Sequence, residues 1–131
     1  MNRYSNAPTI RPPLGNYSHV VEVPAGSTLY YLAGHVGSTP EGEFPPTVEG
    51  QLRACYENIE AVLTDKGLTW RDIVRIKTLV VAQHMQEYRE VRKNVEHRIP
   101  SPPPASTLIG VACLARPEML VEVEVIAAAM K

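Results

Sequence analysis

Residues 47–82, TVEGQLRACYENIEAVLTDKGLTWRDIVRIKTLVVA, decide the fold of this chain. The first half repeats apolar residues at three- and four-residue steps, which predicts an amphipathic helix of about four turns. Thr47 can cap the N-terminus of this helix, and Gly67 can end it. After a capped turn at residues 69–72, the segment 73–82 is β-branched and apolar, which is typical of a strand. A helix followed by such a strand predicts helices packed on a sheet.

The flanking sequence supplies the rest of the sheet. The other expected elements are a hairpin of strands at 17–23 and 29–33, a second helix at 85–98 ended by the prolines from Pro100 onwards, and strands at 107–114 and 120–128. Residues 1–14 contain several prolines and no period, so they predict an irregular arm. The resulting order is ββαβαββ in one α+β domain, residues 1–131. Two helices cover only one face of such a sheet, so the apolar strands predict that the other face meets a second copy.

Composition excludes several classes of protein. The 131 residues carry 13 Lys+Arg against 14 Asp+Glu, a formal charge of −1, which argues against nucleic-acid or membrane-surface binding. Two cysteines, Cys55 and Cys113, are too few for a disulfide scaffold and are expected to be buried thiols in a reducing compartment. The chain has no apolar stretch long enough to span a membrane. These features predict a soluble, cytoplasmic protein.

No freestanding catalytic motif is present. The glycines lack the spacing of a phosphate loop, and the four histidines are scattered singly, so neither a metal nor an organic cofactor is expected. What remains is a set of polar residues or glycines at strand ends and inside apolar strands: Tyr17, Gly34, His35, Ser106, Thr107 and Glu122. Each also has an ordinary structural explanation; Glu122, for example, could lie on the solvent-exposed face of an edge strand.

Five segments in this order resemble the RidA/YjgF family of reactive-intermediate deaminases: Gly15–His19, Ala33–Val36, Gln51–Gly67, Asp72–Val81 and Leu120–Ala127. The resemblance covers the chain from about Gly15 to Met130. It implies a chorismate-mutase-like fold with a mixed sheet, assembled as a homotrimer around a central β-barrel. It also implies ligand clefts between the subunits, which agrees with a sheet face that meets another copy.

The same resemblance implies hydrolysis of short-lived enamines and imines, such as 2-aminoacrylate, to a keto acid and ammonia. Carried over residue by residue, Tyr17 would hydrogen-bond the substrate and Glu122 would orient the water, as the catalytic pair. Gly34 and Leu108 would border the substrate with main-chain groups. Thr107 lies between Leu108 and the residue expected to hold the substrate carboxylate.

The residue at the carboxylate-binding position, Ser106, differs from the one that the family has there. The family has an arginine in the sequence Pro-Ala-Arg-Ser, but here the stretch is Pro104-Ala105-Ser106-Thr107. A charge-assisted hydrogen bond contributes about 1.5–3 kcal/mol and a neutral one about 1 kcal/mol, so Ser106 predicts weak or absent activity on 2-aminoacrylate. Arg92 on the second helix is a candidate replacement cation, with a solvated surface arginine as the alternative. His35 is a further candidate for the cleft, because it follows Gly34.

Three functional hypotheses remain open at this point. The first is an imine hydrolase with a non-standard substrate. The second is a non-catalytic, metabolite-binding trimer that acts as a sensor or scavenger. The third is a ribonuclease or translation inhibitor, names attached to parts of the family, which the charge of −1 and the absence of a basic stripe disfavour.

Overall fold

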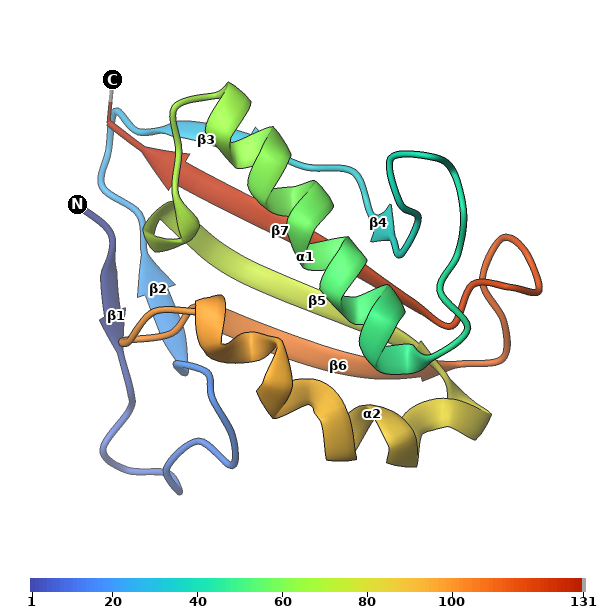
Figure 1. Cartoon of the computed structure of the whole chain (residues 1–131). Helices are drawn as coiled ribbons and strands as arrows, with labels where there is room; N and C mark the ends of the chain where they lie inside the picture. The colour runs from blue at the N-terminus through green and yellow to red at the C-terminus, as the bar shows by residue number, and fades with distance from the viewer. Residues whose placement is uncertain (131) are drawn as a thin grey trace.

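A computed structural model describes residues 1–130 as an α+β fold with its helices on one face of a mixed sheet. The main sheet has the order β3-β7-β5-β6, and β4 also pairs with β7 (Figure 1). β5 and β6 run parallel, and the other pairs of this sheet are antiparallel. The elements are β1 (Arg3–Ser5), β2 (Val20–Glu22), β3 (Thr28–Tyr31), β4 (His35–Val36), α1 (Val48–Asp65), β5 (Ile73–Val81), α2 (Met85–Val91), β6 (Ala105–Val111) and β7 (Val121–Ala129).

Helix α1 confirms the amphipathic helix predicted in the first half of residues 47–82. The Thr47 side chain caps it by accepting a hydrogen bond from the Gly50 amide at 3.0 Å. The helix ends at Asp65, and Gly67 follows with φ of +72°, a conformation that favours glycine. Five of the six residues predicted to form its apolar face are buried, namely Val48, Leu52, Cys55, Ile59 and Leu63, whereas Val62 is partly exposed. The turn at Thr69 is also confirmed, because Thr69 and Asp72 cap each other's backbone amides.

The predicted hairpin near the N-terminus is wrong. β2 pairs with β1, in a separate two-stranded sheet, and β3 pairs with β7 instead. Residues 3–5 of the expected irregular arm therefore form a strand, which an ion pair between Arg3 and Glu22 ties to β2. The alternating pattern identified β2 as a strand, but a pattern of period two does not specify the partner strand.

The second predicted helix is shorter than expected. α2 ends at Val91, and two short 3₁₀ turns, Arg92–Asn94 and Glu96–Arg98, continue to the proline-rich segment. Tyr88 and Val95 are buried as the helical spacing required. Apolar spacing does not distinguish an α-helix from a chain of tighter turns, because both place residues three to four apart on one side.

The two cysteines differ in their exposure to solvent. Cys55 is buried as predicted, and burial raises the pKa of its thiol to about 12. Cys113 is exposed in the turn before β7, so the prediction that it is buried is wrong. No helix among residues 1–130 is long and apolar enough to cross a membrane.

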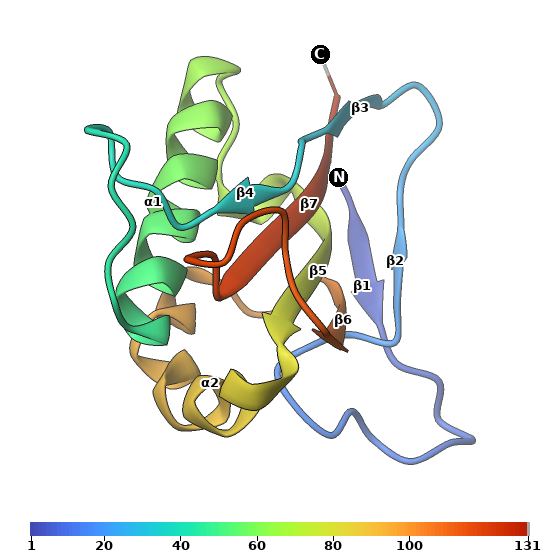
Figure 2. The same cartoon turned by 90° about the vertical axis from the view of Figure 1, so that its right-hand side faces the viewer.

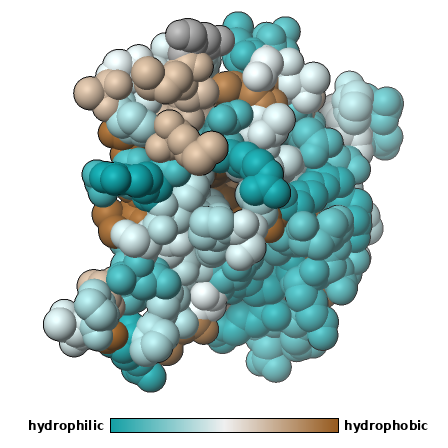
Figure 3. Space-filling view, turned by 90° about the vertical axis from the view of Figure 1, so that its left-hand side faces the viewer, coloured by the Kyte–Doolittle hydropathy of each residue, from teal (hydrophilic) through white to brown (hydrophobic). Residues whose placement is uncertain are grey.

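The two faces of the main sheet have different neighbours. α1 and α2 lie on one side, and the β1–β2 pair lies on the other (Figure 2). We call the side opposite the helices the open face. On the outside of the molecule the helix side is mainly hydrophilic, whereas hydrophobic side chains show beside the sheet (Figure 3). By strand pairing and alternation, the open face carries Arg75, Lys77, Leu79, Thr107, Ile109, Glu122, Glu124 and Ile126. It is therefore mixed in character, not apolar as the sequence suggested.

Gln51 is buried on α1 and joins the loop that follows β4 to the loop that precedes β7. Its amide nitrogen donates to the Pro45 and Glu118 carbonyls at 2.9 and 2.8 Å, and its oxygen accepts from the Leu120 amide at 2.9 Å.

We expect Gln51→Ala to lower the free energy of unfolding by about 2–4 kcal/mol, because it leaves three backbone groups without a partner. Urea denaturation at fixed protein concentration measures the change. Gln86→Ala, at an exposed position of α2, is the control and should stay within about 0.5 kcal/mol of the wild type. An equally small effect of Gln51→Ala would contradict the fastening role.

Candidate functional site

Gly34 and Glu122 lie in contact at the outer edge of the sheet. Gly34 precedes β4, and β4 pairs with the start of β7 so that Val36 stands opposite Glu122. A Cβ atom on residue 34 would stand 2.9 Å from the Cδ atom of Glu122 and closer still to its carboxylate oxygen. Only glycine therefore lets the Glu122 side chain fold over this point of the backbone. The structure brings these two predicted site residues together.

His35 stands next to them on β4, opposite Val123. Val123 is fully buried beneath the helices, so the imidazole belongs to the helix side of the sheet edge. Burial lowers the pKa of His35, and the negative charge of Glu122 opposes this shift. The lowered pKa favours the neutral form of the ring. The Asn58 amide of α1 holds this segment by donating to the Val36 and Ser38 carbonyls at 3.3 and 3.0 Å.

A second group of predicted site residues lies near the start of β6. Ser18 joins the Tyr17 loop to this strand, because its amide donates to the Pro104 carbonyl at 3.1 Å and its hydroxyl donates to the Pro103 carbonyl at 2.6 Å. The Tyr17 hydroxyl accepts from the Leu14 amide at 3.1 Å and keeps its own proton available to donate. Tyr17 is thus anchored beside the residues that begin β6.

The predicted residues of β6 face opposite sides. β6 is an edge strand whose Ser106 and Leu108 stand opposite Ile76 and Thr78, which are buried beneath the helices. Thr107 points to the open face instead, where its hydroxyl accepts from the Arg75 guanidinium at 2.9 Å. Thr107 therefore shares a face with Glu122, whereas Ser106 does not.

Within one chain the predicted site residues form two separate groups. Gly34, His35 and Glu122 lie at the β4 side of the sheet, and Tyr17, Ser106, Thr107 and Leu108 lie at the β6 side. We call them the β4-side group and the β6-side group. Glu122 itself is on β7, two strand spacings of about 4.8 Å from β6, or about 10 Å, and β4 is one spacing further away. Within one chain the two groups therefore lie on different strands, with β5 between β7 and β6.

Arg92 is engaged elsewhere. Its Nε atom donates to both carboxylate oxygens of Glu96 at 3.0 and 3.1 Å, and its guanidinium lies 5.2 Å from the centre of the Tyr88 ring. Burial would lower the pKa of Arg92, but the hydrogen bond to Glu96 and neighbouring charges raise it. Within the described part of the chain, no hydrogen bond, ion pair or ring contact joins Arg92 to another predicted site residue.

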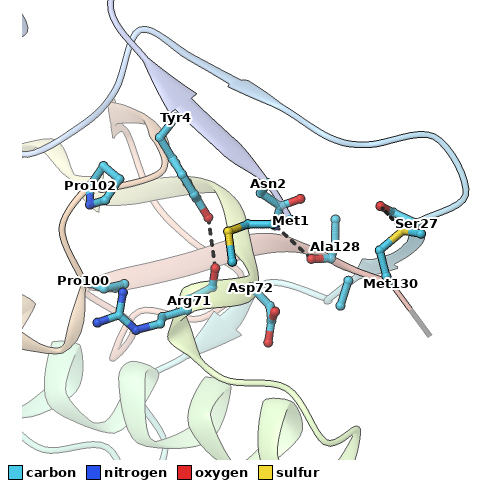
Figure 4. A pocket seen from close by; sticks show the side chains of 11 residues that line it. Met1, Asn2, Tyr4, Ser27, Arg71, Asp72, Pro100, Pro102, Ala128 and Met130 are labelled. Atoms are coloured by element: carbon cyan, nitrogen blue, oxygen red, sulfur yellow. Dashed lines mark hydrogen bonds between the residues drawn. The ribbon is translucent and has the colours of Figure 1, made fainter.

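Two features of the surface were not predicted from the sequence. One is Arg75, which lies on the same face of the sheet as Glu122. The alternation of residues 73–82, IVRIKTLVVA, already indicated which residues share a face with Arg75. The other is a cavity of about 410 Å³ where the N-terminal strand meets the sheet (Figure 4). The Tyr4 hydroxyl donates to the Arg71 carbonyl at 3.0 Å there, and Asn2 donates to the Ala128 carbonyl at 2.9 Å. The lining of this cavity contains none of the predicted site residues.

The family of the chain follows from comparison with known proteins. The family model described as Endoribonuclease L-PSP matches residues 7–129. The RutC family protein PH0854 of Pyrococcus horikoshii is 30% identical over 93% of this chain and 91% of its own length. Reactive Intermediate Deaminase A, chloroplastic, of Arabidopsis thaliana is 28% identical over 77% of this chain and 52% of its own length.

Solved structures agree with the sequence matches. A Rid-family protein of unknown function, YyfB from Yersinia pestis, has a TM-score of 0.86 with 29% identity, over 98% of both chains. Escherichia coli TdcF, solved with bound serine, has a TM-score of 0.68 with 26% identity, over 97% of this chain and 94% of its own. Fold, matched length and sequence point to the same relatives, and the chain belongs to the RidA/YjgF family, whose family model is described as Endoribonuclease L-PSP.

Proposed function

We propose that this protein is an enamine/imine hydrolase that releases ammonia from a small reactive imine. The observation that carries this proposal is the position of the Glu122 carboxylate on Gly34. Among residues 1–130 no side-chain hydrogen bond or ion pair to Glu122 is formed, so its oxygens are available to a water molecule. A carboxylate that lies against the backbone and has no side-chain partner can orient a water and accept its proton.

The reaction requires no redox partner. Water adds to the C=N carbon, the nitrogen gains a proton, and the C–N bond breaks to leave a carbonyl group and ammonia. In this proposal Glu122 orients the attacking water, and the Tyr17 hydroxyl donates a hydrogen bond to the substrate. Gly34 and Leu108 contribute main-chain groups, while Ser106, Thr107 and His35 shape the pocket. Positioning of water against the C=N bond would supply most of the acceleration.

The proposed site is assembled between copies of the chain. The β4-side group and the β6-side group lie at opposite edges of one sheet, so a ring of copies joined head to tail would bring unlike edges together. A homotrimer, as the resemblance implies, would form three equivalent clefts in this way. The open face, which holds both apolar and charged side chains, would face the other copies.

The alternative is a metabolite-binding trimer without catalysis. The observation that favours it is the neutral Ser106 in place of the family's arginine, because a weaker hold on the carboxylate reduces the precision with which a substrate is placed. The relative TdcF was solved with bound serine, which supports a small polar ligand in either case. The formal charge of −1 disfavours the ribonuclease hypothesis, because binding of nucleic acid needs an excess of positive charge.

Replacing the carboxylate of Glu122 tests catalysis directly. We expect the wild type to accelerate ammonia release from at least one member of a panel of imines generated by an amino-acid oxidase. Glu122→Gln should lower kcat by about 10²–10⁴, because the amide cannot accept the proton of water. If the wild type hydrolyses no imine but still binds a keto acid in calorimetry, the sensor alternative replaces the proposal.

Gly34→Ala tests the close approach that positions this carboxylate. The new Cβ atom displaces the Glu122 side chain, so we expect kcat to fall by about tenfold or more while the fold is kept. Gly110→Ala is the control, because its Cβ atom would meet the flexible end of Met85 at 3.4 Å and the Ala82 Cβ atom at an ordinary contact distance of 3.9 Å. Equal activity of Gly34→Ala and the wild type would show that the position of Glu122 on Gly34 does not matter.

A further inference from the structure

A carboxylated substrate needs a positive charge that Ser106 does not provide. Such a charge must satisfy two conditions if it is to serve the proposed site. It must lie beside the β6-side group, and no carboxylate of the protein itself may already neutralise it. A buried or partly buried guanidinium is better suited than an exposed one, because water screens an exposed charge strongly.

Most cations of the described chain are already paired. Carboxylates lie within 4 Å of seven of them: Arg3, Arg53, Lys66, Lys77, Arg92, Arg98 and Arg116. Of the remaining cations in residues 1–130, four are exposed to solvent: Arg11, Arg71, Arg89 and Lys93. Arg75 is therefore the one partly buried cation of the described residues without a carboxylate partner.

The contact made by Arg75 places it at the proposed site. Its guanidinium donates to the Thr107 hydroxyl oxygen at 2.9 Å, across the parallel pair of β5 and β6. This partner is neutral, so the positive charge of Arg75 stays uncompensated. Thr107 accepts that hydrogen bond and keeps its own hydroxyl proton for another acceptor. The guanidinium and the hydroxyl together present a charged and a neutral donor side by side.

We propose that Arg75, held against Thr107, binds the carboxylate of the substrate and so takes over the role of the arginine that Ser106 replaces. This inference rests on the proposed function. It assigns the ligand class as a small monocarboxylate, a 2-imino acid or the 2-keto acid formed from it. A guanidinium matches a carboxylate with two parallel hydrogen bonds, which also fixes the orientation of the ligand.

The location of Arg75 changes the direction from which the carboxylate is held. Arg75, Thr107 and Glu122 share the open face, whereas Ser106 lies on the helix side. Arg75 stands opposite Ile126 and Glu122 stands opposite Leu79, four residues further along β5. The distance along the strand is about 13 Å. The carboxylate on Arg75 of one copy would therefore be processed by Glu122 of another copy.

The test compares ligand binding by Arg75→Gln and the wild type, with pyruvate as the probe in calorimetry. We expect the dissociation constant to rise by about tenfold or more, because the charged donor is lost. Arg75→Lys keeps the charge but not the paired donors, so its loss should be intermediate. Arg89→Gln is the matched control, since it removes an exposed arginine of α2 and should bind pyruvate as the wild type does.

Further readouts separate this inference from the proposed function. On imines that the wild type hydrolyses, Arg75→Gln should raise KM for carboxylated imines and leave neutral imines unaffected. If the wild type hydrolyses no imine but Arg75→Gln still weakens pyruvate binding, the inference holds and the catalytic proposal fails. Equal binding by Arg75→Gln and the wild type, or no carboxylate binding by the wild type, overturns the inference. Should Arg75→Gln fail to fold, Thr107→Val replaces it, with an expected loss of a few-fold in affinity and the same overturning result.

Discussion

Two helices cover one face of the main sheet, and this one-sided coverage governs the rest of the molecule. Strand β7 shows the consequence most clearly, because Val121, Val123 and Val125 are fully buried beneath the helices while Glu122 and Glu124 alternate with them on the open face. Burying the valines drives folding, and the same alternation obliges the glutamates to point away. Burial of the neighbouring valines thus determines which face of the sheet carries Glu122, the residue proposed to orient water.

Local sequence predicted the parts of the fold that local interactions determine. Helix α1 with its Thr47 cap, strand β5 and strand β7 follow from periodicity and capping alone, within a few residues. The pairing of β2 with β1 and the short strand β4 could not be predicted, because both depend on which distant backbone is available to pair. The end of α2 at Val91 was missed for a similar reason, since tertiary packing of Tyr88 and Val95 permits more than one helical geometry.

The residues of the candidate site also differ in how far the sequence predicted their positions. The contact between Gly34 and Glu122 agrees with the family resemblance, and the register of β4 on β7 explains it. Tyr17 lies beside the start of β6 and Glu122 lies on β7, so the proposed convergence of the two side chains would require assembly of several copies. Arg75 escaped notice because the missing charge was sought at the position of Ser106 and on the second helix. The strand pairing of β5 with β6 was needed to place Arg75 against Thr107.

In the proposed assembly, each site combines the β4-side group of one copy with the β6-side group of another. The decisive experiment mixes two inactive variants, Tyr17→Phe and Glu122→Gln, under conditions where subunits exchange. A shared site predicts that the mixture regains activity, in about a quarter of the sites when the chains of a cyclic oligomer assort at random. If native mass spectrometry confirms exchange but the mixture is no more active than its two components, each site lies within one chain and the account is contradicted.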